Sequence, residues 1–180
     1  AYLMENPEVI IEAVNQLEQR QADVQAQTDL DLVAVNKEDL FDDGFSWIGG
    51  NPDGDITLDE FVDYRCGYCR KAHSEVASLL ENDGNIRLIM KEFPILGEAS
   101  VISSRFAIAV KQTQGSDAYK LVHDTLITFN GDVNDVALRR IAEGFDLDAD
   151  VIIARMNSDE VTAEIAATRD LGQRLQISGT

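Results

Sequence analysis

The amino-acid sequence predicts an α/β fold in which a small sheet is followed by a long helical region. Residues 56–64 alternate between apolar and polar side chains, which is typical of a strand with one buried face. Residues 66–80 have helical apolar spacing, and "IRLIMKEF" predicts a second strand that stops at Pro94. Beyond Gly97 the apolar residues keep helical spacing, so we expect only helices in that part of the chain.

The chain begins with a predicted helix from about Pro7 to Gln27, because Asn6 and Pro7 form a helix-start signal before a run of apolar residues at helical spacing. Four apolar residues stand seven apart in this region, at Leu3, Ile10, Leu17 and Val24. Two interpretations remain open. The helix packs on its own domain, or it forms a coiled-coil-like contact with another copy of the chain.

The next elements are shorter. "NKEDLFDDG" predicts a short helix that ends at Gly44, and "FSWIGG" predicts a strand before a turn at residues 51–54. The helix that starts near Cys66 ends at Asn82-Asp83-Gly84. Helical spacing then predicts helices over Val101 to Val110, Ala118 to Leu126, Val136 to Ile141, Val151 to Met156 and Val161 to Leu175.

Composition limits the function classes. A chain of 180 residues with 44% apolar content can form one core of moderate size. Its formal charge of −18 argues against nucleic acids and anionic membrane surfaces, because these partners need clustered Lys and Arg. The sequence shows no basic start followed by an apolar run, which is the pattern of a signal peptide. If the protein is exported, we therefore expect this sequence to be its mature form.

The only two cysteines, Cys66 and Cys69, form a Cys-x-x-Cys at the expected junction of strand and helix. A disulfide across so short a loop adds little stability, so a purely structural role for the pair is poorly supported. Cys66 lies where helix N–H groups and the dipole favour an anion, so we expect it to be the low-pKa thiol and Cys69 the resolving thiol. Four cationic residues around the pair would stabilise a thiolate or form a solvated helix face, namely Arg65, Arg70, Lys71 and His73.

Two motifs compete for Glu60. A calcium loop centred on Gly54 would use Gly49, Asn51, Asp53, Asp55 and Glu60. Its first ligand would be a glycine, and a strand follows it where a calcium loop needs a helix, so a hairpin turn is the preferred interpretation.

The alternation from residue 56 places Glu60 on the core-facing side of the strand, together with Ile56, Leu58, Val62 and Tyr64. Burial raises the pKa of a carboxyl group, so Glu60 could accept the proton of Cys69 during exchange. The alternative is a buried acid that is paired with Lys91 or Arg87 on the next strand.

The residues "DITLDEFVDYRCGYCRKA" resemble the active-site strand and helix of the DsbA family of bacterial thiol-disulfide oxidoreductases. The initial helix, the "KEFPILG" strand end and the helical region extend the resemblance, which is closest to a branch with an N-terminal oligomerisation extension. The resemblance implies a thioredoxin-like fold with a helical insertion. It also implies that Cys66 is the nucleophile, Cys69 the resolving thiol and Glu60 the buried acid, with substrate contacts at Gly67, Tyr68 and Thr180.

The resemblance divides the chain into four parts. These are an N-terminal helical extension (1–43), a first thioredoxin-like half with the cysteines (44–99), a helical insertion (100–175) and the start of a cis-proline loop (176–180). Two departures matter. Gly67-Tyr68 lacks the His of strongly oxidising members, which leaves the redox potential open. The expected cis-proline, two strands and final helix would follow Thr180, so we expect the C-terminal part of the sheet to be missing.

The expected function is disulfide exchange with exported protein substrates through Cys66 and Cys69, as an oxidase or as an isomerase or reductase. A redox partner would reset the pair, and the expected location is the periplasm or cell envelope. No cofactor and no metal are expected, and a homo-oligomer could form through the N-terminal helix. Two other classes stay open, namely a metal-binding module that uses Cys66, Cys69 and His73, and a non-catalytic oligomerising envelope protein.

Overall fold

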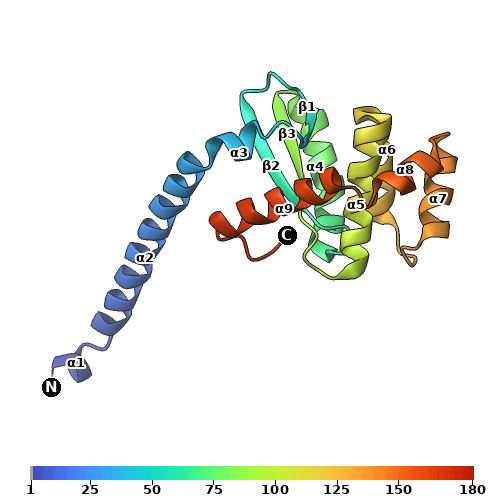
Figure 1. The fold of residues 1–180 in the computed structure, drawn as a ribbon. Helices are drawn as coiled ribbons and strands as arrows, with labels where there is room; N and C mark the ends of the chain where they lie inside the picture. The colour runs from blue at the N-terminus through green and yellow to red at the C-terminus, as the bar shows by residue number, and fades with distance from the viewer. Residues whose placement is uncertain (1) are drawn as a thin grey trace. The chain divides into compact units, whose positions relative to one another are not determined.

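The protein is described by a computed structural model that covers residues 2–180 (Figure 1). It contains two compact units, which divide between Lys37 and Glu38 rather than at residue 43. The short helix α3 (Lys37–Phe41) contributes to the second unit, because Arg87 and Lys91 donate hydrogen bonds to the backbone oxygens of Phe41 and Asp39. The predicted helix in "NKEDLFDDG" is confirmed, but it ends at Phe41 and not at Gly44.

The first unit consists of α1 (Tyr2–Glu5) and the long helix α2 (Glu8–Val35). The predicted end of this helix at Gln27 was wrong, since α2 continues to Val35. Polar pairs one turn apart support the continuation, with the side-chain amides of Gln25 and Gln27 donating to Asp29 and Asp31 at 2.7 and 2.9 Å. By itself this unit leaves its apolar side chains exposed, including Leu3, Ile10, Leu17 and Val24.

The second unit is built around a three-stranded sheet in the order β1-β3-β2, with β1 at Trp47–Gly50, β2 at Ile56–Val62 and β3 at Ile86–Glu92. β1 pairs antiparallel with β3, and β2 pairs parallel with β3. Helix α4 (Gly67–Asp83) makes the crossover from β2 to β3 and ends at Gly84, whose φ of 69° is left-handed. The predicted order of strand, helix and strand is confirmed.

The turn at residues 51–54 is real, but it is not a hairpin turn, because β3 lies between β1 and β2. The Gly54 N–H donates to the Asn51 carbonyl oxygen at 2.9 Å, and the Asn51 N–H donates to Ile86 at 2.8 Å. A Cβ at Gly54 would lie 2.4 Å from the backbone oxygen of Asn85, so this close approach requires glycine. Strand β2 follows the turn, in agreement with the rejection of a calcium loop.

Both faces of the sheet are covered, which corrects the expectation of a strand with one buried face. Ile56 was expected to face the core but lies 55% exposed at the start of β2. On the face opposite to Glu60, the Phe61 ring packs edge-on against Phe93 at 5.4 Å. Gly172 comes so close to Phe93 that a Cβ there would lie 2.6 Å from the ring. The central strand β3 is therefore buried on both sides, whereas β2 is exposed at Ile56 and Thr57, partly covered from Leu58 to Phe61 and buried at Val62.

Five helices form the rest of the chain, as predicted: α5 (Glu98–Gln114), α6 (Ser116–Thr128), α7 (Asp135–Gly144), α8 (Ala149–Arg155) and α9 (Asp159–Arg174). The last three begin with side-chain caps, supplied by Asn134, Asp148 and Ser158. Helix α5 is central, because residues 106–110 are fully buried. Within residues 2–180, no helix is both long enough and apolar enough to cross a bilayer.

Candidate active site

The two cysteines lie where β2 passes into α4, as the sequence predicted. Cys66 has extended backbone angles and precedes the first residue of α4, and its N–H donates to the Asp63 carbonyl oxygen at 3.0 Å. Cys69 lies in the first turn of the helix, and both residues are buried free thiols. Between them Gly67 and Tyr68 are exposed, and Tyr68 has 80% of its surface accessible. The intervening dipeptide is thus presented to solvent beside a pair that is shielded from it.

The surroundings of the two sulfur atoms separate their acidities. Burial raises the pKa of Cys66, but hydrogen bonds from the Thr180 side chain and from the backbone of Cys69 and Tyr68 outweigh it, so the pKa lies below that of an ordinary cysteine. Burial also raises the pKa of Cys69, and there the contacts with Asp63 and Thr180 do not compensate, so it stays above the ordinary value. A thiolate therefore forms at Cys66 before it forms at Cys69.

Thr180 lies beside the thiol pair although it is far away in sequence. The Cys66 Sγ donates to the backbone oxygen of Thr180 at 3.5 Å. The residue that the family resemblance selected as a substrate contact is therefore adjacent to the nucleophile, together with Gly67 and Tyr68.

The predicted cations around the pair have other partners. The Arg70 guanidinium donates to the backbone oxygens of Tyr64 at 3.1 Å and Phe129 at 2.6 Å. Arg65 donates to the Gly131 oxygen at 3.4 Å, and Lys71 is exposed. None of these contacts is with a sulfur atom, so Arg70 acts mainly as an anchor that ties the start of α4 to the end of α6.

A buried carboxylate that the sequence did not single out holds the active-site loop. Asp63 is fully buried. One of its oxygens accepts from the Arg65 N–H at 2.8 Å, and the other accepts from the N–H groups of Ile95 and Leu96 at 2.8 and 3.0 Å. Asp63 therefore joins the loop before Cys66 to the loop after β3. In the sequence, only its position three residues before Cys66 points to this role of Asp63.

Glu60 is half-buried on the α4 side of the sheet, where it lines a cavity of about 30 Å³ together with His73 and His123. Burial raises its pKa, as expected. The alternative pairing is wrong: Lys91 pairs with Asp43 at 2.6 Å, and Arg87 pairs with Asp42 at 3.5 Å. Within residues 2–180 no hydrogen bond joins Glu60 to either cysteine, so the structure places it in the cavity and not against the sulfurs.

A buried polar cluster lies between β3 and α6. The hydroxyl groups of Tyr64 and Tyr119 both donate to Glu92 Oε1 at 2.7 Å, and the Tyr64 oxygen lies 3.0 Å from His123 Nδ1. Burial raises the pKa of Glu92 to about 7 and lowers that of His123 to about 3. Sequence analysis had placed Tyr64 on the core side of its strand but could not detect its partners, because they come from β3 and α6.

The opposite face of the sheet carries a second buried acid. Both carboxylate oxygens of Asp59 are buried, and neither has a hydrogen-bond partner among residues 2–180. Burial raises the pKa of Asp59 to about 7, which the charge of Lys91 only partly offsets. Like Glu92, this group is predominantly protonated in mildly acidic solution.

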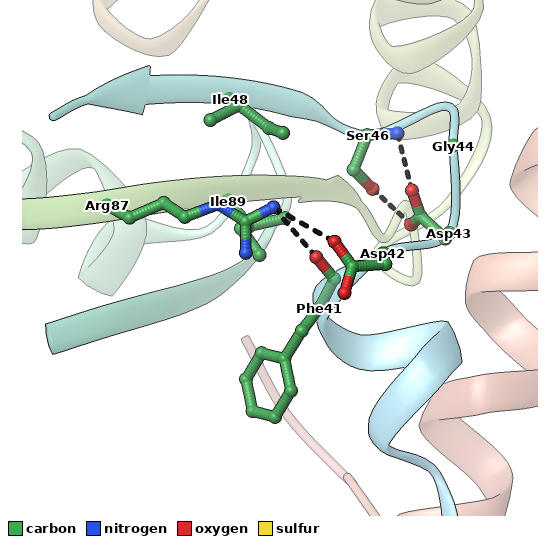
Figure 2. A pocket seen from close by; sticks show the side chains of 8 residues that line it. All are labelled: Phe41, Asp42, Asp43, Gly44, Ser46, Ile48, Arg87 and Ile89. Carbon is green, nitrogen blue, oxygen red and sulfur yellow. Dashed lines mark hydrogen bonds and ion pairs between the residues drawn. The ribbon is translucent and has the colours of Figure 1, made fainter. Parts of the chain in front are cut away.

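A cavity of the second unit lies away from the cysteines. It has a volume of about 210 Å³ and is lined by residues of α3, β1, β3 and the loop after α3. Its polar groups satisfy one another: Arg87 donates to the Phe41 oxygen and to Asp42, and Asp43 accepts from the backbone and hydroxyl of Ser46 (Figure 2). These pairings join α3 and the loop after it to β3 and to the start of β1.

Comparison with known proteins yields two family matches. Residues 57–180 match the DSBA-like thioredoxin domain, and residues 1–23 match the copper resistance protein ScsC N-terminal domain.

Solved structures agree with the first match. A thioredoxin-like oxidoreductase from Silicibacter pomeroyi is 41% identical, with a TM-score of 0.74 over 81% of this chain and 82% of that one. The thiol-disulfide exchange protein alpha-DsbA2 from Wolbachia pipientis is 26% identical, with a TM-score of 0.80 over 87% of this chain and 84% of that one.

Among curated proteins, the Na(+)/H(+) antiporter NhaA 3 of Salinispora tropica is 26% identical over 133 residues, or 74% of this chain. The match spans only 20% of the antiporter's length.

Proposed function

Because the chain belongs to the DsbA-like thioredoxin domain family, we propose that it is a thiol-disulfide oxidoreductase that uses Cys66 and Cys69. The observation that carries the proposal is the opposite direction of the two pKa shifts, downward at Cys66 and upward at Cys69. A buried disulfide clip would need no such difference. A pair that exchanges disulfides needs one sulfur that attacks and leaves easily and a second that acts later.

The proposed reaction has two balanced steps. In the oxidised pair, a substrate thiolate attacks Cys66 Sγ, the bond between Cys66 and Cys69 breaks, and Cys69 leaves as a thiolate that takes up a proton. A second substrate thiolate then attacks the substrate sulfur of the mixed disulfide, which releases the Cys66 thiolate and an oxidised substrate. Run in reverse, the same steps reduce a substrate disulfide, and isomerisation combines the two directions.

The residues around Cys66 suggest how a substrate is held. Gly67 and Tyr68 are exposed next to Cys66, and the backbone oxygen of Thr180 lies 3.5 Å from Cys66 Sγ. An extended peptide bound between these two edges would bring its cysteine to Cys66. Backbone hydrogen bonds at Thr180 would make this binding largely independent of sequence, which suits an enzyme that accepts many partly folded chains.

Glu60 is proposed as the acid and base for Cys69. Its raised pKa suits proton transfer near neutral pH. The cavity that it lines runs along α4 from His73 to Leu80, and Cys69 lies one turn before His73. Within residues 2–180 no hydrogen bond joins Glu60 to Cys69, so the proton would pass through a water molecule between them.

The wider setting of the reaction is proposed on the same basis. Substrates would be exported proteins with free thiols or disulfides, in the periplasm or cell envelope, and a redox partner would reset the pair. The exposed apolar residues of α2 at seven-residue spacing would join copies of the chain in a coiled coil.

The test is the equilibrium redox potential of the pair together with catalysis of the reduction and oxidation of a model disulfide peptide. We expect a potential between about −270 and −120 mV and activity that the Cys66→Ser substitution removes. Wild-type protein without activity above the uncatalysed rate, with Cys66 as weakly acidic as free cysteine, would overturn the proposal and leave a non-catalytic envelope protein.

A further inference from the structure

The two histidines of the chain lie together, although 50 residues separate His73 from His123. His73 comes from α4 and His123 from α6, and their ring centroids are 5.5 Å apart. Asp124 follows His123 and completes the group. One ligand-type atom from each of the three side chains lies within 4.8 Å of the other two.

The spacing fits a metal ion. His73 Nε2 lies 3.4 Å from Asp124 Oδ1. In a tetrahedral zinc site with bonds of about 2.0–2.1 Å, two ligand atoms are separated by about 3.3–3.4 Å. The pair already has the separation that a shared ion would impose, and a donor atom of His123 lies within 4.8 Å of both.

The donor atoms at this site are not used by other partners. Asp124 binds Lys120 through Oδ2, whereas its Oδ1 is buried and accepts no hydrogen bond within residues 2–180. His123 is only 2% exposed and contacts Tyr64 through Nδ1 at 3.0 Å. Because the Tyr64 hydroxyl donates to Glu92, the proton in this contact belongs to His123 Nδ1, and Nε2 keeps its lone pair.

We propose that His73, His123 and Asp124 bind a divalent transition-metal ion of the zinc class at a site separate from the cysteine pair. The Glu92–Tyr64 hydrogen bonds orient His123, which is the outer support that metal-binding histidines usually have. The adjoining cavity of about 30 Å³ has room for a water molecule as the fourth ligand.

The chemistry of the donors selects the ion. Two imidazoles and one carboxylate suit zinc, copper or nickel, whereas calcium and magnesium prefer sites made entirely of oxygen. The site also differs from the metal-binding alternative that the sequence left open, which combined His73 with Cys66 and Cys69. Within residues 2–180, His73 gathers with His123 and Asp124, and no such group of three includes a cysteine.

Zinc binding by the full-length, oxidised chain tests the site, because a Cys66–Cys69 disulfide offers no thiolate to the metal. Titration calorimetry with Zn²⁺ should give one ion per chain, and Co²⁺ should produce the visible absorption of a tetrahedral site. Each of His73→Asn, His123→Asn and Asp124→Asn should weaken Zn²⁺ binding by about 10-fold or more. Asp117→Asn is the matched control, since it removes the same charge from an exposed position on α6 and should leave affinity unchanged.

His123→Asn keeps a donor near the Nδ1 position, so the Tyr64 contact can survive the loss of the ligand nitrogen. If this variant nevertheless fails to fold, the two half-exposed positions His73 and Asp124 decide the question. Oxidised wild-type protein that binds no Zn²⁺ would overturn the site. The same conclusion follows if His73→Asn and Asp124→Asn bind as tightly as the wild type. The redox activity of the cysteines is measured separately, so failure of the metal site and failure of the proposed oxidoreductase function can be distinguished.

Discussion

Cys66 Sγ and the backbone oxygen of Thr180 lie 3.5 Å apart, although 114 residues separate them in the sequence. The contact brings the residue after the helical region back to the start of α4. In the proposed exchange reaction, the backbone at Thr180 would be the edge at which a substrate peptide binds next to Cys66. The consequences of this arrangement can be measured at Cys66 and at the buried acids around it.

Alkylation of Cys66 should follow a titration below that of free cysteine. In a Cys69→Ser variant, the rate of reaction with iodoacetamide should rise with pH, and the midpoint of this rise should lie below that of a free cysteine thiol, which is about 8.5. The reason is the lowered pKa of Cys66. The reduced protein should also gain stability as the pH rises through this folded-state pKa, because the thiolate is favoured more in the folded than in the unfolded chain. A profile that matches free cysteine would contradict the assignment of the nucleophile.

Replacement of Glu60 by Gln should slow the steps that need proton transfer at Cys69. We expect a loss of about 10-fold or more in the rate at which Cys69 resolves a mixed disulfide, with little change in the first attack at Cys66. Rapid-quench measurements of the mixed disulfide between pH 5 and 9 separate the two steps. Glu75→Gln, an exposed change on α4, is the control. Equal rates in both variants would leave Glu60 with a structural role only.

Replacement of Glu92 by Gln should alter how stability depends on pH. The carboxyl pKa rises from 4.5 to about 7 on folding. Between these values the folded state keeps a proton that the unfolded state releases, so stability falls as the pH rises, by up to about 1.4 kcal/mol per pH unit. Glu92→Gln removes this contribution while its amide oxygen still accepts from Tyr64 and Tyr119.

The measurement is urea unfolding at pH 5 and pH 8, compared between wild type and Glu92→Gln. The wild type should lose more stability between these two values than the variant does. Some decline should remain in the variant, because Asp59 has a similarly raised pKa and contributes with the same sign. An equal decline in both proteins would show that Glu92 ionises as an ordinary surface acid.

A methyl group at Gly54 should destabilise the second unit. A Cβ there would lie 2.4 Å from the Asn85 oxygen and 2.8 Å from the Arg87 nitrogen, and neither backbone atom can move without disturbing β3. We expect Gly54→Ala to cost about 1–3 kcal/mol in the free energy of unfolding. Gly144→Ala is the matched control, because no atom lies within 4 Å of its Cβ position at the end of α7. That variant should be neutral or more stable by up to about 1 kcal/mol.

Much of the local structure could be predicted because it depends on short-range patterns. Alternation in residues 56–64 identified β2, and the helical spacing of apolar residues after Gly97 identified the five helices. The ends were less certain: α2 continues to Val35 because glutamine and aspartate side chains pair along it, which a search for apolar spacing does not detect.

The environment of each site residue was harder to predict. Glu60 was expected to be buried, and it is half-buried, but neither proposed cation pairs with it because Lys91 and Arg87 turn toward Asp43 and Asp42. Those aspartates lie in a loop whose position depends on α3 packing against the second unit. A strand pattern tells which side a residue faces, and it does not tell which distant segment covers that side.

The sequence by itself determined the order of the elements and the position of a Cys-x-x-Cys at the start of a helix, because both follow from local periodicity and from the geometry of a helix N-terminus. Only the tertiary structure decided which groups surround that pair. It brought Thr180 to Cys66, Asp63 to the loop after β3, and His123 and Asp124 to His73. These contacts join segments far apart in the chain, and packing of the helices around the sheet is what brings them together.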